Sequence, residues 1–175
     1  AAPRLPEALW RALLDALRRE GVLALRGAFV HLPEHGVRLS ASEERIAQKV
    51  APRLEQAGYE GAWARDLARD ANESEALMRT TLARLAQRGE LHQVVKDLYY
   101  PLATMARLAA IARNVAAADG TQQVSAASFR DATGLGRKRA SQILEYVARV
   151  GLLRRVGDMH KLRADSTLFV EAVMS

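Results

Sequence analysis

Apolar residues recur at helical spacing along three segments of the chain, and each of these segments ends at a glycine. The glycines are Gly21, Gly89 and Gly151, and each fits the left-handed residue that closes an amphipathic helix. An apolar run, a polar or glycine-bearing turn and a second apolar run follow each glycine, which predicts a β-hairpin. The pattern therefore predicts a long helix followed by a two-stranded ribbon, three times along the chain.

Two additional helical patterns, one long and one short, precede the second and the third of these units. The long pattern before the second unit starts with a capping-box pair, Ser40 and Glu43, and contains Pro52, where we expect a kink or an early end. Helix, short helix, long helix and ribbon is the element order of a winged helix-turn-helix domain. The predicted fold is therefore mostly α with small β-ribbons, arranged as tandem winged helix-turn-helix domains.

The same pattern predicts where the domains begin and end. Residues 1–39 are expected to be the C-terminal half of a truncated winged helix, because the two front helices are missing. Residues 40–100 and residues 101–175 are each expected to form a complete winged helix, and the latter to fold alone. The start AAPRLPEALW has no Met and leads almost directly into a helix, which indicates a piece of a longer protein. At the joint between the two complete domains, we expect Tyr99 and Tyr100 to pack rather than to stack on bases.

The net charge of the 175-residue chain, +6, is concentrated in one segment. Residues 130–163 contain nine Lys or Arg and three acids, so the remainder of the chain is neutral in total. A single basic segment in a neutral chain indicates a binding site for a polyanion.

The sequence also excludes several kinds of site. The absence of cysteine rules out disulfides and thiolate metal sites. His31 and His35 lack a third ligand at a recognisable spacing, so we expect no metal site. The sequence has no apolar stretch of the roughly 20 residues that a membrane span needs, no Ser/His/Asp set, no pair of catalytic carboxylates and no G-x-x-x-x-G-K-[ST] phosphate loop. We therefore expect no enzyme, no cofactor and no membrane partner.

The start of the third long helix is unusual in its charge. Arg137, Lys138 and Arg139 follow Gly136 there, whereas the equivalent start of the second long helix, residues 72–75, reads NESE and resembles a capping box. Each cation at the positive end of the helix dipole costs about 0.3–1 kcal/mol. A local choice that opposes folding indicates function, and a helix start with added cations suits a phosphate.

Residues 129–163, FRDATGLGRKRASQILEYVARVGLLRRVGDMHKLR, resemble the last winged-helix domain of the bacterial selenocysteine-specific elongation factors. The shared motifs are FRD in the short helix, G-x-x-R-K before the long helix, LEY within it, and RR-x-G-D-x-H-x-L in the ribbon. The family usually has Phe-Asp where this chain has Val147 and Ala148, a departure that affects no basic position. The resemblance extends to the whole chain in its architecture, and it is specific in motif over residues 129–163 alone.

The resemblance implies that the chain is the mRNA-binding arm of a cytoplasmic translation elongation factor. The expected direct partner is an mRNA stem-loop, the selenocysteine insertion sequence (SECIS), beside an in-frame UGA codon. The family carries GTPase and tRNA-binding domains upstream, so GTP, the ribosome and selenocysteinyl-tRNA are expected to be partners of the parent protein only. The fragment itself is expected to be a monomer that neither binds nor hydrolyses GTP.

The candidate RNA-binding residues come from the start of the third long helix and from the ribbon, which are neighbours in a winged helix and should present their charges on one face. The cations suit phosphates and base edges, Gln142 a base, and His160 a phosphate. The full set is Arg137, Lys138, Arg139, Gln142, Arg154, Arg155, His160, Lys161 and Arg163.

Two other functions are compatible with a winged helix. One is a DNA-binding transcriptional regulator, whose long helix would lie in a major groove. Glu145 on that helix would be awkward in such a groove, and the cations gather at the helix start and ribbon instead of along the helix. The other is a protein-interaction module, an interpretation we favour for the near-neutral residues 1–100, which would act as a spacer.

Overall fold

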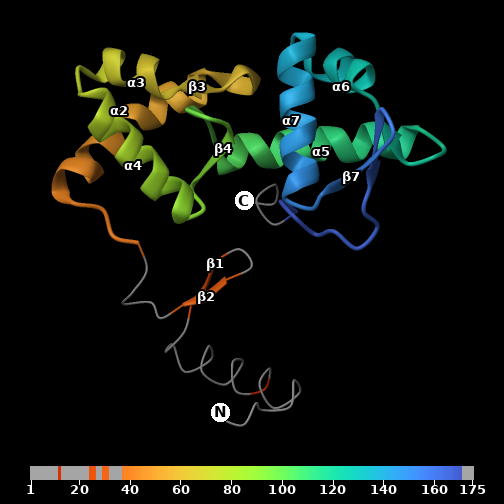
Figure 1. Ribbon diagram of the computed structural model, residues 1–175, viewed down its shortest axis with the longest axis horizontal. Coiled ribbons are helices and arrows are strands. Elements are labelled where there is room, and N and C mark those ends of the chain that lie inside the picture. Colours follow the sequence, from red (N-terminus) through yellow and green to blue (C-terminus); the bar gives the residue numbers. More distant parts are fainter. Residues whose placement is uncertain (1–11, 13–23, 27–28, 32–36, 171–175) are drawn as a thin grey trace.

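The computed structural model describes residues 12, 24–26, 29–31 and 37–170 (Figure 1). In the first part of the chain, β1 (Ala24–Arg26) pairs antiparallel with β2 (Phe29–His31), which confirms the hairpin predicted there. The long helix expected before this hairpin, its closing glycine and His35 lie outside the described residues.

The middle unit has three helices and a three-stranded antiparallel sheet. Its sheet order is β3-β5-β4, so the predicted ribbon, β4 and β5, gains a third strand of only two residues. The elements in chain order are α2 (Ala41–Gln56), the short 3-10 helix η2 (Gly58–Glu60), β3 (Ala62–Trp63), α3 (Ala64–Ala71), α4 (Glu75–Gln87), β4 (Leu91–Val95) and β5 (Leu98–Pro101).

The last unit repeats this plan. Its sheet order is β6-β8-β7, and Val156 pairs with Met159 across the turn at Gly157 and Asp158, as expected for the wing. The elements are α5 (Leu102–Ala118), β6 (Gln123–Val124), α6 (Ala126–Thr133), α7 (Arg137–Arg149), β7 (Leu153–Val156) and β8 (Met159–Leu162). The two units confirm the predicted tandem winged-helix fold, with three-stranded sheets in place of two-stranded ribbons.

Helix ends in the two units follow the predicted closing glycines. Gly89 and Gly151 have φ of 79° and 102°, and the residue after each donates its N–H back into the helix end, which is a Schellman motif. The Ser40–Glu43 capping box is present at the start of α2. Pro52 lies inside α2, which continues to Gln56. The helix therefore does not end early at this proline, which was one of the two outcomes expected from the sequence.

The start of α4 differs from the expected arrangement. Asn72 ends α3 in the left-handed conformation, with φ of 55°, and takes no part in capping α4. Ser74 is the N-cap instead, and its side chain accepts from the N–H of Leu77 at 3.1 Å. Glu75 is in the first turn, whereas Glu73 precedes the cap and pairs with Lys49 at 3.1 Å. The contrast with the basic start of α7 therefore depends on Ser74 and Glu75.

The hydrophobic core is divided unequally between the units. Val94, Leu98 and Tyr100 of β4 and β5 are fully buried in the cluster formed mainly by α5, α6 and α7, while Tyr99 belongs to the cluster of the middle unit. The Tyr100 hydroxyl donates to the carbonyl of Tyr59 at 2.8 Å. In Figure 1, α5 leads directly away from the sheet of the middle unit and passes behind α7. The two tyrosines therefore form the packed joint predicted from the sequence, and the units share part of one core.

Candidate nucleic-acid interface

The first turn of α7 carries three cations and no acid. Gly136 is its N-cap and provides no side-chain hydrogen bond to the free N–H groups. Arg137 and Lys138 are exposed, and within the described part of the chain neither side chain has a hydrogen bond or an ion pair. Two positive charges beside the N–H groups of a helix start form a surface that suits an anion.

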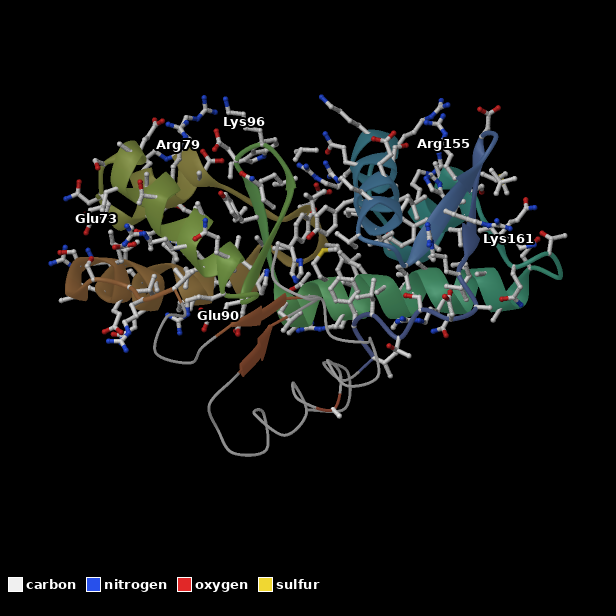
Figure 2. All side chains as sticks on the ribbon, turned by 60° about the horizontal axis from the view of Figure 1, so that its bottom comes forward. Glu73, Arg79, Glu90, Lys96, Arg155 and Lys161 are labelled. Carbon is white, nitrogen blue, oxygen red and sulfur yellow. The ribbon has the colours of Figure 1, made fainter. Side chains whose placement is uncertain are left out.

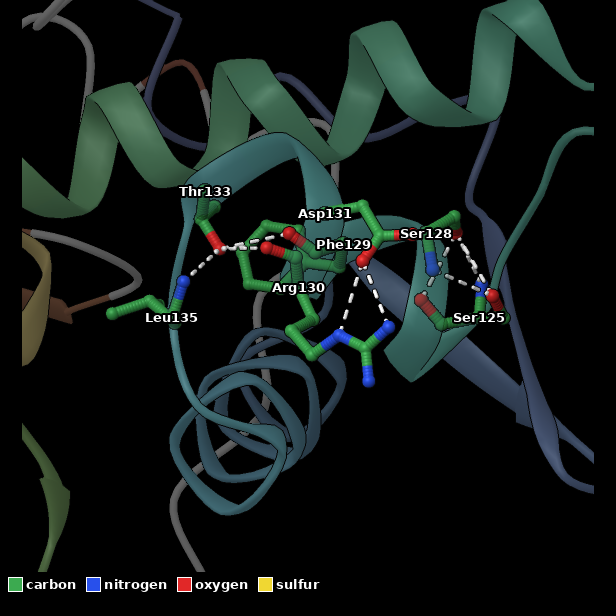
Figure 3. A network of polar contacts seen from close by, with 7 residues as sticks. All are labelled: Ser125, Ser128, Phe129, Arg130, Asp131, Thr133 and Leu135. Carbon is green, nitrogen blue, oxygen red and sulfur yellow. Dashed lines mark hydrogen bonds and ion pairs between the residues drawn. The ribbon is translucent and has the colours of Figure 1, made fainter.

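The position of this helix start is set by the packing of α7 and by the turn that precedes it. The opposite face of the helix is buried in the core through Ala140, Ile143, Leu144 and Val147. Figure 3 shows the polar contacts that hold α6, in which Ser125 caps the helix by accepting from the N–H of Ser128 at 2.9 Å. After α6, Gly134 has φ of 74° and Leu135 is buried, so the chain reverses at a fixed point before α7 begins.

Arg139 differs from the two cations before it. Its side chain is 16% exposed, and its Nε donates to Oε2 of Glu60 at 3.3 Å. Its Nη1 donates to Oε1 of Gln142 at 3.0 Å, and the guanidinium carbon lies 5.4 Å from the ring centre of Trp63. Arg139 thus joins α7 to η2 and β3 of the middle unit, and Gln142 is engaged through it. Nothing in the linear pattern marked Glu60 or Trp63 as part of the site.

The wing cations are divided between the two faces of its sheet. Arg154 pairs in register with Lys161, and Arg155 with His160, so these two pairs lie on opposite faces. Figure 2 shows Arg155 and Lys161 on the wing, at the end of the molecule away from Glu73. Arg154, Arg155 and Arg163 are exposed, and Lys161 is half-buried. From the sequence we expected the basic residues to share one face, but the register places the wing residues on both faces of the sheet.

His160 is buried and lies on the core side of the wing. It is 9% exposed, and within the described part of the chain its Nε2 has no hydrogen-bond partner. Burial lowers the pKa of the ring below its ordinary value of 6.5, Arg155 lowers it further, and Glu145 opposes this change. The ring therefore lies away from the surface and its neutral form is favoured, so the phosphate contact suggested by the sequence stays a prediction that this position does not favour.

The described residues contain no group of three or more His, Cys, Asp or Glu side chains arranged to hold a metal ion. No helix described by the structure is long and apolar enough to cross a membrane.

Three family models match the chain. The model for the winged-helix domain of the selenocysteine-specific elongation factor matches residues 39–100. Two models for a winged helix of elongation factor SelB match residues 1–32 and residues 116–162.

The chain is also similar to whole proteins and to a solved structure. It is 39% identical to the selenocysteine-specific elongation factor of Escherichia coli (strain K12) over 98% of this chain, and 32% identical to that of Haemophilus influenzae over 94%. It spans about a quarter of the length of these relatives, 27% and 26%. A similar structure is the mRNA-binding domain of elongation factor SelB from E. coli in complex with SECIS RNA, with a TM-score of 0.65 and 41% identity. The match covers 71% of this chain and 99% of that one.

Proposed function

Since this chain belongs to the SelB family of selenocysteine-specific elongation factors, we propose that it is the RNA-binding arm of such a factor. Its ligand is a SECIS hairpin in an mRNA, and its binding supports selenocysteine incorporation at an in-frame UGA codon. The similarity to the mRNA-binding domain of E. coli SelB, which was solved in complex with SECIS RNA, supports this choice of ligand.

The observation that carries the proposal is the exposed start of α7, which has no side-chain cap and carries two cations, Arg137 and Lys138, without a partner among the described residues. Phosphates of a hairpin backbone bind to such a surface, and the unpaired bases at a hairpin tip can be splayed out for contact. Arg154, Arg155 and Arg163 add exposed positive charge on the wing and just after it, and Lys161 adds a half-buried one. Glu145 is exposed on α7 itself, which disfavours insertion of this helix into the groove of a DNA duplex.

The proposal assigns different work to the parts of the chain. Residues 101–175 hold the RNA, residues 40–100 set the position of that site, and residues 1–39 belong to a further winged helix. The fragment is a monomer without catalysis or cofactor. GTP, selenocysteinyl-tRNA and the ribosome are partners of the longer parent protein in the cytoplasm.

The test is a titration of the chain with three nucleic acids of equal length. They are the SECIS hairpin that the E. coli neighbour binds, a linear RNA of the same composition and a DNA duplex. We expect the hairpin to bind most tightly, with a slope of log K against log salt of about −3 to −5 if four to six phosphates are engaged. Equal affinity for all three would contradict the proposal, because it would leave only non-specific polyanion binding.

A further inference from the structure

A depression of about 260 Å³ lies between the start of α7 and the middle unit. One side of it comes from η2 and β3, through Glu60 and Trp63, and the other from α7. The full lining is Glu60, Trp63, Gly136, Lys138, Arg139 and Gln142. The depression therefore borders Lys138, one of the two cations that we assign to the RNA backbone, and two of its six lining residues, Glu60 and Trp63, were not foreseen as part of the site from the sequence.

Trp63 is the aromatic group of this depression. It is 39% exposed, whereas its neighbour Ala62 is buried and fixes the strand against β5. The Trp63 backbone is also the N-cap of α3, so its position does not depend on the ring. The guanidinium carbon of Arg139 lies 5.4 Å from the centre of the ring. The protein thus holds a large, flat, partly uncovered side chain directly beside a cationic surface.

The lining chemistry favours a base over a phosphate inside the depression. The Glu60 side chain lines the depression and is 62% exposed, and its carboxylate would repel a phosphate that entered. A nucleobase is uncharged, and every base has a face that stacks on an aromatic ring or on a guanidinium plane. The oxygens of Glu60 and Gln142 can accept from an exocyclic amino group. Lys138, at the rim, remains for the phosphate attached to that base.

The arrangement is already formed in the protein without RNA. Arg139 is held by hydrogen bonds to Glu60 and Gln142 and by its contact with Trp63. Side chains that are ordered before binding lose little conformational freedom when the ligand arrives, so more of the stacking energy appears as affinity.

We propose that this depression receives one unpaired nucleobase of the bound RNA, stacked against Trp63. The inference rests on the proposed hairpin function and deepens it, because it makes the middle unit part of the RNA site and not only a spacer. Trp63 then contributes to affinity by stacking, and the groups around it contribute to the choice of base.

The experiment uses the full chain with the substitution Trp10→Phe, since Trp10 and Trp63 are its two tryptophans. The SECIS hairpin that the E. coli neighbour binds is titrated while tryptophan emission and, separately, hairpin fluorescence anisotropy are recorded. We expect the emission of Trp63 to be quenched along the same binding curve as the anisotropy. In the same background, Trp63→Ala should weaken hairpin binding roughly 5- to 150-fold, and Trp63→Phe should retain most of the affinity. Melting curves of both variants show whether they remain folded. If Trp63→Ala unfolds, the hairpin affinity of Trp63→Phe and the quenching of Trp63 emission decide whether a base stacks on this ring.

Arg154→Ala serves as the matched control. It should weaken binding through the backbone while leaving the full quenching of Trp63 at saturation. If the hairpin binds without any change in Trp63 emission, and the Trp63 variants bind as tightly as their parent, the stacking inference is wrong and the proposed function stands. If the hairpin shows no binding by anisotropy, the proposed function fails and this inference fails with it.

Discussion

Replacing Arg137 and Lys138 together by Ala should make the protein more stable and a weaker RNA binder. Each exposed cation in the first turn of α7 opposes the helix dipole by about 0.3–1 kcal/mol, so their removal should raise the free energy of unfolding by about 0.6–2 kcal/mol at low salt. The gain should shrink as salt screens the charges. Against the SECIS hairpin, the variant loses two charged contacts of about 1.5–3 kcal/mol each. The slope of log K against log salt should also become shallower by about 1.5–2.

The assay combines melting curves with hairpin titrations, and two other variants make it decisive. Glu75→Ala removes the acid from the equivalent turn of α4, so it should lower the melting temperature and leave RNA affinity unchanged. Arg139→Ala removes an ion pair with Glu60 as well as a dipole penalty, so its effect on stability should be small. If the double variant melts markedly lower and still binds the hairpin, Arg137 and Lys138 are structural and our reasoning is refuted.

Three further predictions concern stability. The fold lowers the pKa of His160 below its ordinary value of 6.5, so protonation favours the unfolded chain and the free energy of unfolding should fall as the pH drops below about 6.5. His160→Gln should flatten this dependence in melts between pH 7 and pH 5. Residues 101–175 alone should melt far below residues 37–175, because β4 and β5 contribute three fully buried side chains whose burial stabilises the fold by about 1.5–3 kcal/mol each. Equal melting temperatures would disprove the shared core. Gly61→Ala should lower the free energy of unfolding by about 2–4 kcal/mol in chemical denaturation, because φ is 75° and a Cβ would lie 2.6 Å from the ring of Tyr100. An unchanged denaturation midpoint would show that the packing around Tyr100 can adjust.

The helices and wings could be predicted because their signals are local. A helix that buries one face must repeat apolar residues at helical spacing, and a helix that ends in a Schellman motif favours glycine at the closing position. Gly89 and Gly151 are such residues, so the ends of α4 and α7 and the following hairpins were found correctly. β3 and β6 were missed because strands of two residues are too short to show an alternating pattern.

The site was harder to predict because it depends on distant contacts and on register. Arg139 and Glu60 are 79 positions apart in the chain, and no local pattern connects them. In the wing, the residues between Leu153, which is buried, and Leu162, which is half-buried, show no regular alternation of apolar and polar side chains, so the sequence did not show that His160 lies on the core face. The structure shows this through the burial of His160 and through the register, which puts it on the same face of the sheet as Leu153 and Leu162. The charge pattern located the basic surface, and the fold decided which of its members are free to bind.

This division changes how the basic start of α7 should be interpreted. Three cations in one turn looked equivalent, but one of them already has a carboxylate, an amide and an aromatic ring as partners in the free protein. A phosphate would have to compete with Glu60 for Arg139, whereas Arg137 and Lys138 have no such competitor among the described residues. The backbone of the RNA is therefore expected to bind the first two cations, and Arg139 is expected to act through the surface it forms with Trp63. Charge-based affinity for the RNA backbone and contact with an RNA base are therefore expected to come from different residues at the start of α7.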